Sequence, residues 1–230
     1  MTSWQFDEFQ QVGRDYGNPR EVEIYDSTQA DFRDVEAESK ELLDLLALAS
    51  SDVLIDSVRE RGRLPSRPRA AVPACMRCFG GDDRLCEGKG EYRRNLEHRF
   101  SHAGFLTTNI STTFALHHLP DRWKGIALAR MRSMLKPGGQ LYIHDVILEQ
   151  NNATEVIKAF IDQQSLAGGD FLKRDAEGHF QQERSTYDWI LDGLLARTGY
   201  RTVSKTIHDG VIGKYHCLRD ARNISEPFRD

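Results

Sequence analysis

Three segments decide the fold: TFALHHLPD at residues 113–121, LKPGG at residues 135–139 and QLYIHDVIL at residues 140–148. The first segment is typical of the end of a strand, followed by a helix that begins at the Pro-Asp pair. Apolar side chains then recur at helical spacing as far as the Pro-Gly-Gly sequence, which ends the helix and makes a turn. The third segment is a mostly apolar run that predicts a buried strand. Together they predict a strand–helix–strand unit of an α/β sheet.

The flanking sequence continues this alternation. Residues 34–48 begin acidic and become rich in leucine, which predicts a helix with one buried face, and residues 52–56 (DVLID) predict a buried parallel strand that ends in an acid. Near the other end, residues 185–188 (STYD) have the form of a helix N-cap box, and an apolar stripe follows. Residues 201–207 and 211–218 predict two strands around an Asp-Gly turn, which suits a hairpin.

The FALHHLPD and LKPGG segments, at this spacing, resemble those of the class I S-adenosylmethionine (SAM)-dependent methyltransferases, in particular the branch of ubiquinone and menaquinone C-methylases. The resemblance covers roughly residues 4–56 and 100–219. It implies an α/β fold with a mostly parallel, seven-stranded sheet, helices on both faces and a C-terminal antiparallel hairpin. It also implies SAM as cofactor and a small-molecule methyl acceptor. Methyl transfer in this family is an in-line displacement that depends on positioning and desolvation.

The resemblance also implies a cofactor site, because cofactors bind at the carboxyl ends of the strands in such sheets. Asp56 would end strand one beside the cofactor. Four residues at the end of strand four would line the methionine and methyl end of the cofactor: Thr113, Phe114, Ala115 and Leu116. Residues 1–35 would form a lid over the site. The catalytic residues stay open, and no metal ligand is expected.

The sequence after Asp56 departs from the family pattern. Strand one should lead into a glycine-rich turn, because the cofactor approaches the backbone too closely for side chains. Residues 57–63 are SVRERGR instead, and residues 57–99 hold ten arginines without a helical or strand period. An acid at the end of strand two, which would bind the ribose hydroxyls, is also missing. A structureless run of this length is abnormal inside a compact domain.

The genetic code offers an explanation for this aberrant segment. Permitted codons for residues 56–65, with one lost base restored after the Asp56 codon, translate as DIGAGTGALA. Residues 78–99 fit the other shifted frame, which permits an amphipathic helix and loop. We interpret residues 57–99 as a frame-shifted copy of the glycine-rich motif. Residues 107–112 are short for a whole strand four, which suggests a further deletion there. The alternative function is that of a non-catalytic, partly folded product of a damaged methyltransferase gene.

Other functions have weaker support. Three cysteines with a nearby histidine suggest a zinc site, but their spacing is loose and the frame shift accounts for them: Cys75, Cys78 and Cys86, with His98 or His102. The arginines suggest a nucleic-acid patch, but shifted GC-rich codons produce arginine readily. His117 and His118 are expected to shape the site wall rather than to act as a base. His144 and Asp145 either touch substrate or pack at a strand end.

Composition sets the broad class of the protein. The chain has 230 residues, a net charge of -4 and 39% hydrophobic residues, which suits one globular domain over residues 1–230. A pI near 6.1 gives no reason to expect nucleic acid or membrane as a partner. The N-terminus lacks a basic segment followed by an apolar one, so we expect a cytoplasmic protein. The oligomeric state is not predicted.

Overall fold

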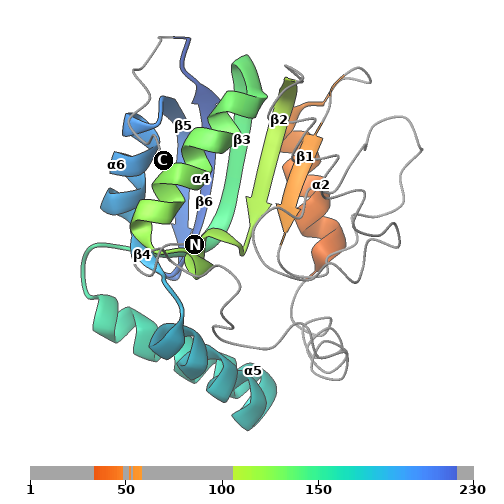
Figure 1. Ribbon diagram of the computed structural model, residues 1–230. Helices are drawn as coiled ribbons and strands as arrows, with labels where there is room; N and C mark the ends of the chain where they lie inside the picture. Colours follow the sequence, from red (N-terminus) through yellow and green to blue (C-terminus); the bar gives the residue numbers. More distant parts are fainter. Residues whose placement is uncertain (1–33, 49–51, 53, 59–105, 222–230) are drawn as a thin grey trace, which may run out of the picture.

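The computed structural model describes residues 34–48, 52, 54–58 and 106–221. Figure 1 shows their arrangement. In chain order, the elements are α2 (Val35–Leu46), β1 (Leu54–Val58), β2 (Thr107–Thr113), η1 (Leu116–His118), α4 (Asp121–Met134), β3 (Leu135–Leu148), α5 (Ala153–Gln182), β4 (Thr186–Tyr187), α6 (Asp188–Arg197), β5 (Tyr200–His208) and β6 (Ile212–Arg219).

The strands form one mixed sheet in the order β1-β2-β3-β6-β5, and β4 pairs with β3 off this path. β1, β2 and β3 are parallel, whereas β6 is antiparallel to both of its neighbours. Every strand except β6 therefore points the same way. The predicted fold class is confirmed as an α/β, mostly parallel, Rossmann-like sheet with a C-terminal antiparallel hairpin. The described residues supply six strands where the sequence predicts seven, and β1 is the outermost of these on its side.

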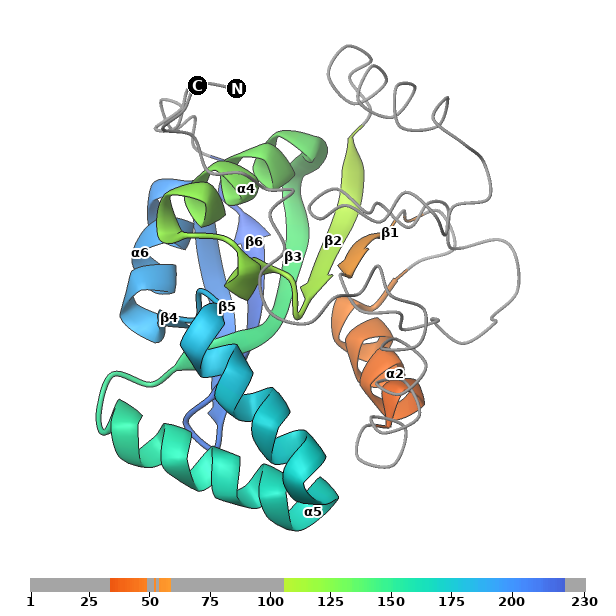
Figure 2. The same cartoon turned by 60° about the horizontal axis from the view of Figure 1, so that its bottom comes forward.

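Helices cover both faces of the sheet, because successive side chains of a strand point to opposite faces. Leu141 and Ile143 of β3 join the core beneath α4 and α6, while Tyr142 packs against Leu42 and Leu46 of α2. Figures 1 and 2 show α2 on one side of the sheet and α4 and α6 on the other. The apolar stripes predicted for these helices are therefore their sheet-facing sides.

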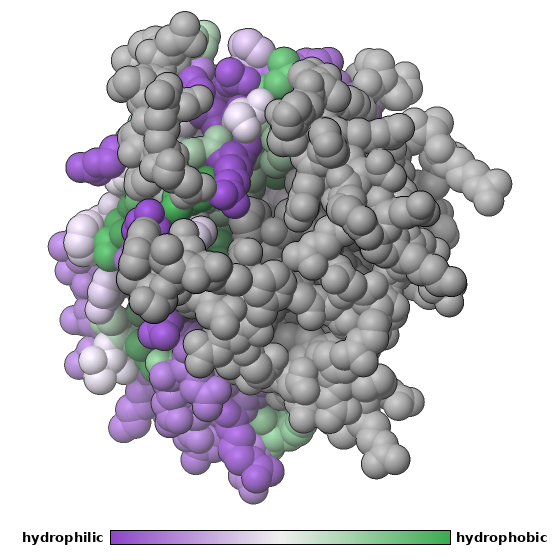
Figure 3. All heavy atoms as spheres, viewed as in Figure 1, coloured by the Kyte–Doolittle hydropathy of each residue, from purple (hydrophilic) through white to green (hydrophobic). Residues whose placement is uncertain are grey.

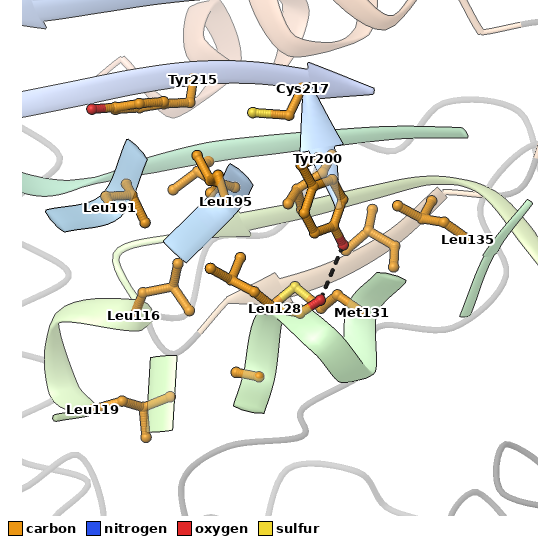
Figure 4. Close-up of a cluster of buried hydrophobic side chains, with 14 of the residues drawn as sticks. Leu116, Leu119, Leu128, Met131, Leu135, Leu191, Leu195, Tyr200, Tyr215 and Cys217 are labelled. Carbon is orange, nitrogen blue, oxygen red and sulfur yellow. Dashed lines mark hydrogen bonds between the residues drawn. The ribbon is translucent and has the colours of Figure 1, made fainter. Parts of the chain in front are cut away.

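The larger core lies between the sheet and the pair α4 and α6 (Figure 4). Leu128 and Met131 of α4 and Leu191 and Leu195 of α6 are almost fully buried there. Burial of each such side chain contributes roughly 1.5–3 kcal/mol. The Tyr200 hydroxyl lies in the same core and donates to the Leu128 carbonyl at 3.2 Å, so its polar end is satisfied.

The LKPGG segment makes the predicted turn, but as a bulge within β3 rather than before it. Thr107 pairs with Leu135, and Asn109 pairs with Gln140, so three extra residues of β3 bulge out between these two pairs. Gly138 has a φ of 74°, which glycine adopts without strain. The helix α4 ends at Met134, one residue before this segment. The strand therefore begins at Leu135 rather than at the expected Gln140.

The expectation that residues 107–112 are too short for a whole strand four is wrong. β2 spans Thr107–Thr113; it pairs with β3 from Thr107 onward and with β1 from Asn109 onward. Seven residues exceed the usual strand length of about five or six, and β-branched threonine and isoleucine favour the extended backbone. Five residues of this strand are buried although only Ile110 is apolar. Its polarity, not its length, is the unusual feature.

The segment between β3 and α6 forms α5, which lies beyond the carboxyl ends of the strands (Figure 1). Gly168 and Gly169 have non-helical backbone angles and divide α5 into two helical arms. Apolar side chains of both arms pack on the end of β3 and on Val211: Val156, Ile157, Phe160 and Phe180. Figure 3 shows a largely hydrophilic outer surface over α5. In the described part of the chain, no helix is long and apolar enough to cross a membrane.

The N-cap box predicted at residues 185–188 does not form. The helix α6 begins at Asp188, and its N-cap residue Tyr187 makes no side-chain cap hydrogen bond. The reason is that Thr186 and Tyr187 pair with the end of β3 as the short strand β4. The Ser185 hydroxyl instead contacts the His179 ring. The predicted hairpin is confirmed, with Asp209 and Gly210 at positive φ in its turn.

Candidate functional site

The expected cofactor residues lie at one edge of the sheet, where the parallel strands β1 and β2 end. Asp56 pairs with Ser111 of β2, and the last pair of the two strands joins Val58 to Thr113. Phe114 follows with a φ of 47°, and its N–H still donates to the His144 carbonyl at 2.8 Å. Ala115 and Leu116 are buried at the start of η1. The backbones of the five expected residues are thus brought to neighbouring strand ends.

Leu116 has a second role that the sequence did not indicate. Its side chain is buried in the core below α4, with Leu119 and Leu128 nearby in the same cluster (Figure 4). The side chain of Leu116 therefore anchors the turn after β2 in the hydrophobic core.

Asp145 of β3 fixes this turn. Its Oδ2 atom accepts the N–H groups of Ala115 at 3.1 Å and Leu116 at 2.7 Å. Its Oδ1 atom accepts the Val146 N–H at 2.8 Å and contacts His117 Nδ1 at 2.5 Å. Burial alone would raise the pKa of Asp145, but the His117 charge and these hydrogen bonds outweigh it and lower the pKa to about 2. A carboxylate at position 145 thus holds the turn after β2.

His117 stands between two carboxylates. Its Nδ1 atom faces Asp145, and its Nε2 atom lies 3.0 Å from Oε2 of Glu183, which follows α5. Burial would lower the pKa of His117, but the charge of Asp145 and hydrogen bonds to both carboxylates raise it to about 9. Glu183 has a pKa held well below its usual range, because hydrogen bonds to His117 and His179 outweigh its burial. The cluster is an ionic one inside the protein.

Two further histidines complete the cluster. His118 Nδ1 lies 3.7 Å from Glu183 Oε2, and His179 Nδ1 lies 2.6 Å from the same atom. The other ring nitrogen of His179 contacts the Ser185 hydroxyl at 2.7 Å. The backbone here is also tied down, because the N–H of Arg184 donates to the His117 carbonyl at 2.6 Å. The end of α5 is therefore fastened to η1.

His144 and Asp145, which the sequence left open between substrate contact and packing, are both buried. The His144 ring lies 4.7 Å from the Phe114 ring and 6.4 Å from the Tyr142 ring, between centroids. Asp145 accepts hydrogen bonds from backbone N–H groups and contacts His117. Within the described residues, both therefore have a packing or anchoring role.

Sequence reasoning missed Glu183 and His179. They are separated from His117 by more than sixty positions, and the cap box expected just after them, at residues 185–188, gave no indication of a contact with His117. The one available signal was the i, i+4 spacing of His179 and Glu183, which places two ligand-type side chains on one side of a helix end. The cysteines of the alternative zinc site and the residues of the expected lid lie outside the described residues.

No family model and no curated protein matches the sequence. Among solved structures, a putative methyltransferase from Bacillus halodurans is 13% identical, covers 80% of this chain and 99% of its own, and has a TM-score of 0.45. An O-methyltransferase family 2 protein from Planctomyces limnophilus, in complex with apigenin, is 18% identical with a TM-score of 0.35; the match covers 50% of this chain and spans only 30% of that protein. LepI in complex with SAM is 10% identical, with a TM-score of 0.44. The match covers 81% of this chain and 41% of LepI.

Proposed function

We propose that this chain carries the scaffold of a SAM-dependent methyltransferase that acts on a small-molecule acceptor. The observation that carries the proposal is the joint position of the two motif segments. FALHHLPD forms the turn from β2 into α4, and LKPGG opens β3 directly after α4, in a sheet where β1, β2 and β3 are parallel neighbours. That is the arrangement implied by the sequence resemblance, including the antiparallel last strand.

The proposed cofactor site is the edge where β1 and β2 end. Ligands of open α/β sheets bind outside the carboxyl ends of the strands. The backbone of residues 113–116 would border the methionine and methyl end, and Asp56 would lie beside it on β1. Asp145 contributes by position, since it holds the Ala115 and Leu116 N–H groups and keeps this turn in one conformation. SAM supplies the methyl group, and the protein contributes orientation and exclusion of water.

We propose in addition that this chain has lost tight cofactor binding through the frame shift at residues 57–99. The glycine turn normally allows close backbone approach and places a helix N-terminus beside the cofactor. Arg59, Arg61 and Arg63 add bulk at those positions, and a positively charged sulfonium gains nothing from arginine neighbours. The second candidate function, a non-catalytic and partly folded product of a damaged gene, rests on this departure.

Calorimetric titration with SAM tests both proposals. The unaltered chain is compared with a version in which residues 57–99 are re-encoded in the two shifted frames. We expect the re-encoded chain to bind in the micromolar range, about 8 kcal/mol, and the unaltered chain to give no measurable heat at the same concentrations.

A matched control is the re-encoded chain with arginine in place of the first glycine of the restored turn, which should lose binding again. Tight binding by the unaltered chain would remove the functional consequence of the frame shift. Failure of both chains to bind SAM, with both folded, would contradict the cofactor proposal itself.

A further inference from the structure

The proposed methyl transfer assigns no role to the cluster of histidines and carboxylates at η1. His117, His118 and Glu183 each offer one ligand atom, and these atoms all lie within 4.8 Å of one another. The three side chains are nearly inaccessible to solvent. Imidazole nitrogen and carboxylate oxygen are the donor types that divalent transition metals such as Zn²⁺ take in proteins.

Two of the three distances between the donor atoms are close to those around a tetrahedral ion. Two ligands at about 2.0–2.1 Å from a tetrahedral Zn²⁺ are about 3.3 Å apart. Glu183 Oε2 lies 3.0 Å from His117 Nε2 and 3.7 Å from His118 Nδ1, one distance on each side of that value. The ligand atoms of the two histidines lie within 4.8 Å of each other, so their rings would have to approach by up to about 1.5 Å when a metal binds.

The groups around the three donors orient them for a metal. A metal would replace the proton on His117 Nε2, and Asp145, which contacts Nδ1, would hold the remaining proton on that nitrogen, so that the lone pair of Nε2 points toward Glu183. A carboxylate behind a ligating histidine fixes its tautomer and ring orientation in metal sites. On the other side, His179 Nδ1 contacts Glu183 and is itself held by Ser185.

Charge favours a cation at the same place. Asp145 and Glu183 place two carboxylates in a buried cluster, and buried charges are costly unless they are paired or coordinate a metal. A divalent ion would compensate both carboxylates, whereas one imidazolium compensates one.

We propose that His117, His118 and Glu183 bind one divalent first-row transition-metal ion, with Asp145 and His179 as the hydrogen-bonded groups that orient the ligands. Three protein ligands leave a fourth tetrahedral position for water. Since His117 and His118 belong to η1 and Glu183 follows α5, the ion would fasten the end of α5 to the turn after β2.

The test is zinc binding by the full chain, measured by equilibrium dialysis with metal analysis and by titration against a chromophoric chelator. The unaltered chain should bind about one Zn²⁺ per chain. Glu183→Gln should abolish this binding, and Asp145→Asn should weaken it about 10–100-fold, as loss of an outer-shell partner does. Glu177→Gln, the same change within α5 at a residue that is not part of the cluster, should bind like the unaltered chain.

Cysteines provide the rival site, so the triple variant Cys75→Ser, Cys78→Ser, Cys86→Ser is the second control and should keep the ion. With Co²⁺, the spectrum should show tetrahedral bands without thiolate-to-metal charge transfer. Circular dichroism of each variant confirms folding before its binding is compared. Absence of stoichiometric Zn²⁺ in the unaltered chain, retention by folded Glu183→Gln, or loss in the triple serine variant would each overturn the proposal.

Discussion

At the scale of single residues, Asp145 is the side chain on which the local structure depends most. It accepts three backbone N–H groups and contacts His117, with 1% of its surface exposed. An asparagine side chain has the same shape as aspartate, but its N–H₂ group would face backbone N–H groups that need an acceptor. We expect Asp145→Asn to lower the free energy of unfolding by about 3 kcal/mol, because a buried charge pair is broken and donors are left unpaired.

Urea denaturation with a chelator present measures this effect without interference from metals. The control is Asp162→Asn, the same change at an exposed position of α5, which should alter stability by less than about 0.5 kcal/mol. Equal effects of the two substitutions would show that the Asp145 contacts contribute little.

Cys217 permits a second test at this scale. Its thiol is buried in the core on β6, and burial raises its pKa to about 12, more than the weak contact with Thr202 lowers it. In a variant with the other three cysteines changed to serine, Cys217 should react with Ellman's reagent at pH 8 at least about 100-fold more slowly than after denaturation. Fast reaction of the folded variant at pH 8 would show that the thiol of Cys217 on β6 is accessible to the reagent and not buried.

The residues of the site were only partly predictable. The FALHHLPD motif located His117 and the turn, because a strand end followed by a Pro-Asp helix start is a local pattern. The sequence could not show that His117 lies between Asp145 and Glu183, since these contacts join positions 28 and 66 residues away. Pairing of that kind depends on where α5 packs, and α5 has no motif of its own.

At the scale of elements, the bulge in β3 makes glycine necessary at one position. A Cβ atom on Gly139 would lie 2.9 Å from the carbonyl oxygens of Lys136 and Thr108, which are backbone atoms and cannot rotate away. We expect Gly139→Ala to destabilise the protein by about 1–3 kcal/mol, measured by urea denaturation.

Gly178 in the second arm of α5 is the matched control. A Cβ atom there meets nothing within 4 Å, and the backbone is helical. Gly178→Ala should therefore stabilise the protein, by up to about 1 kcal/mol. A loss of stability from Gly178→Ala, or none from Gly139→Ala, would contradict the geometry of the respective element.

Helices and strands with a regular spacing of apolar residues were predictable from the sequence. Segments whose structure depends on contacts with residues far away in the chain were not. The leucine-rich helix α2, the strand β3 and the hairpin follow from periodicity and turn residues. Residues 107–112 were expected to be too short for a whole strand. They form one nevertheless, although six of the seven residues of β2 are polar, because the segment pairs with β1 and β3. The cap box at residues 185–188 failed for the same reason, since pairing with β3 keeps Thr186 and Tyr187 extended.

At the scale of the whole molecule, the distribution of charged residues and the salt dependence of any DNA binding distinguish the enzyme proposal from a nucleic-acid-binding function. The chain has 31 basic and 35 acidic residues, but ten arginines fall within residues 57–99. If this segment were a nucleic-acid site, its arginines would neutralise phosphates and release counterions. The affinity would then fall steeply with salt, with a logarithmic slope near -0.9 per phosphate contact on duplex DNA.

We expect no such site, because the frame-shift interpretation accounts for the arginines and the net charge of -4 repels a polyanion. Fluorescence anisotropy with labelled duplex and single-stranded DNA should show dissociation constants no tighter than the nonspecific range of about 10⁻⁴–10⁻⁶ M at physiological salt. Replacement of Arg59, Arg61 and Arg63 by alanine should leave the signal unchanged. Binding in the nanomolar range that weakens steeply with salt, and that the triple replacement removes, would establish residues 57–99 as a functional basic segment and end their interpretation as a damaged motif.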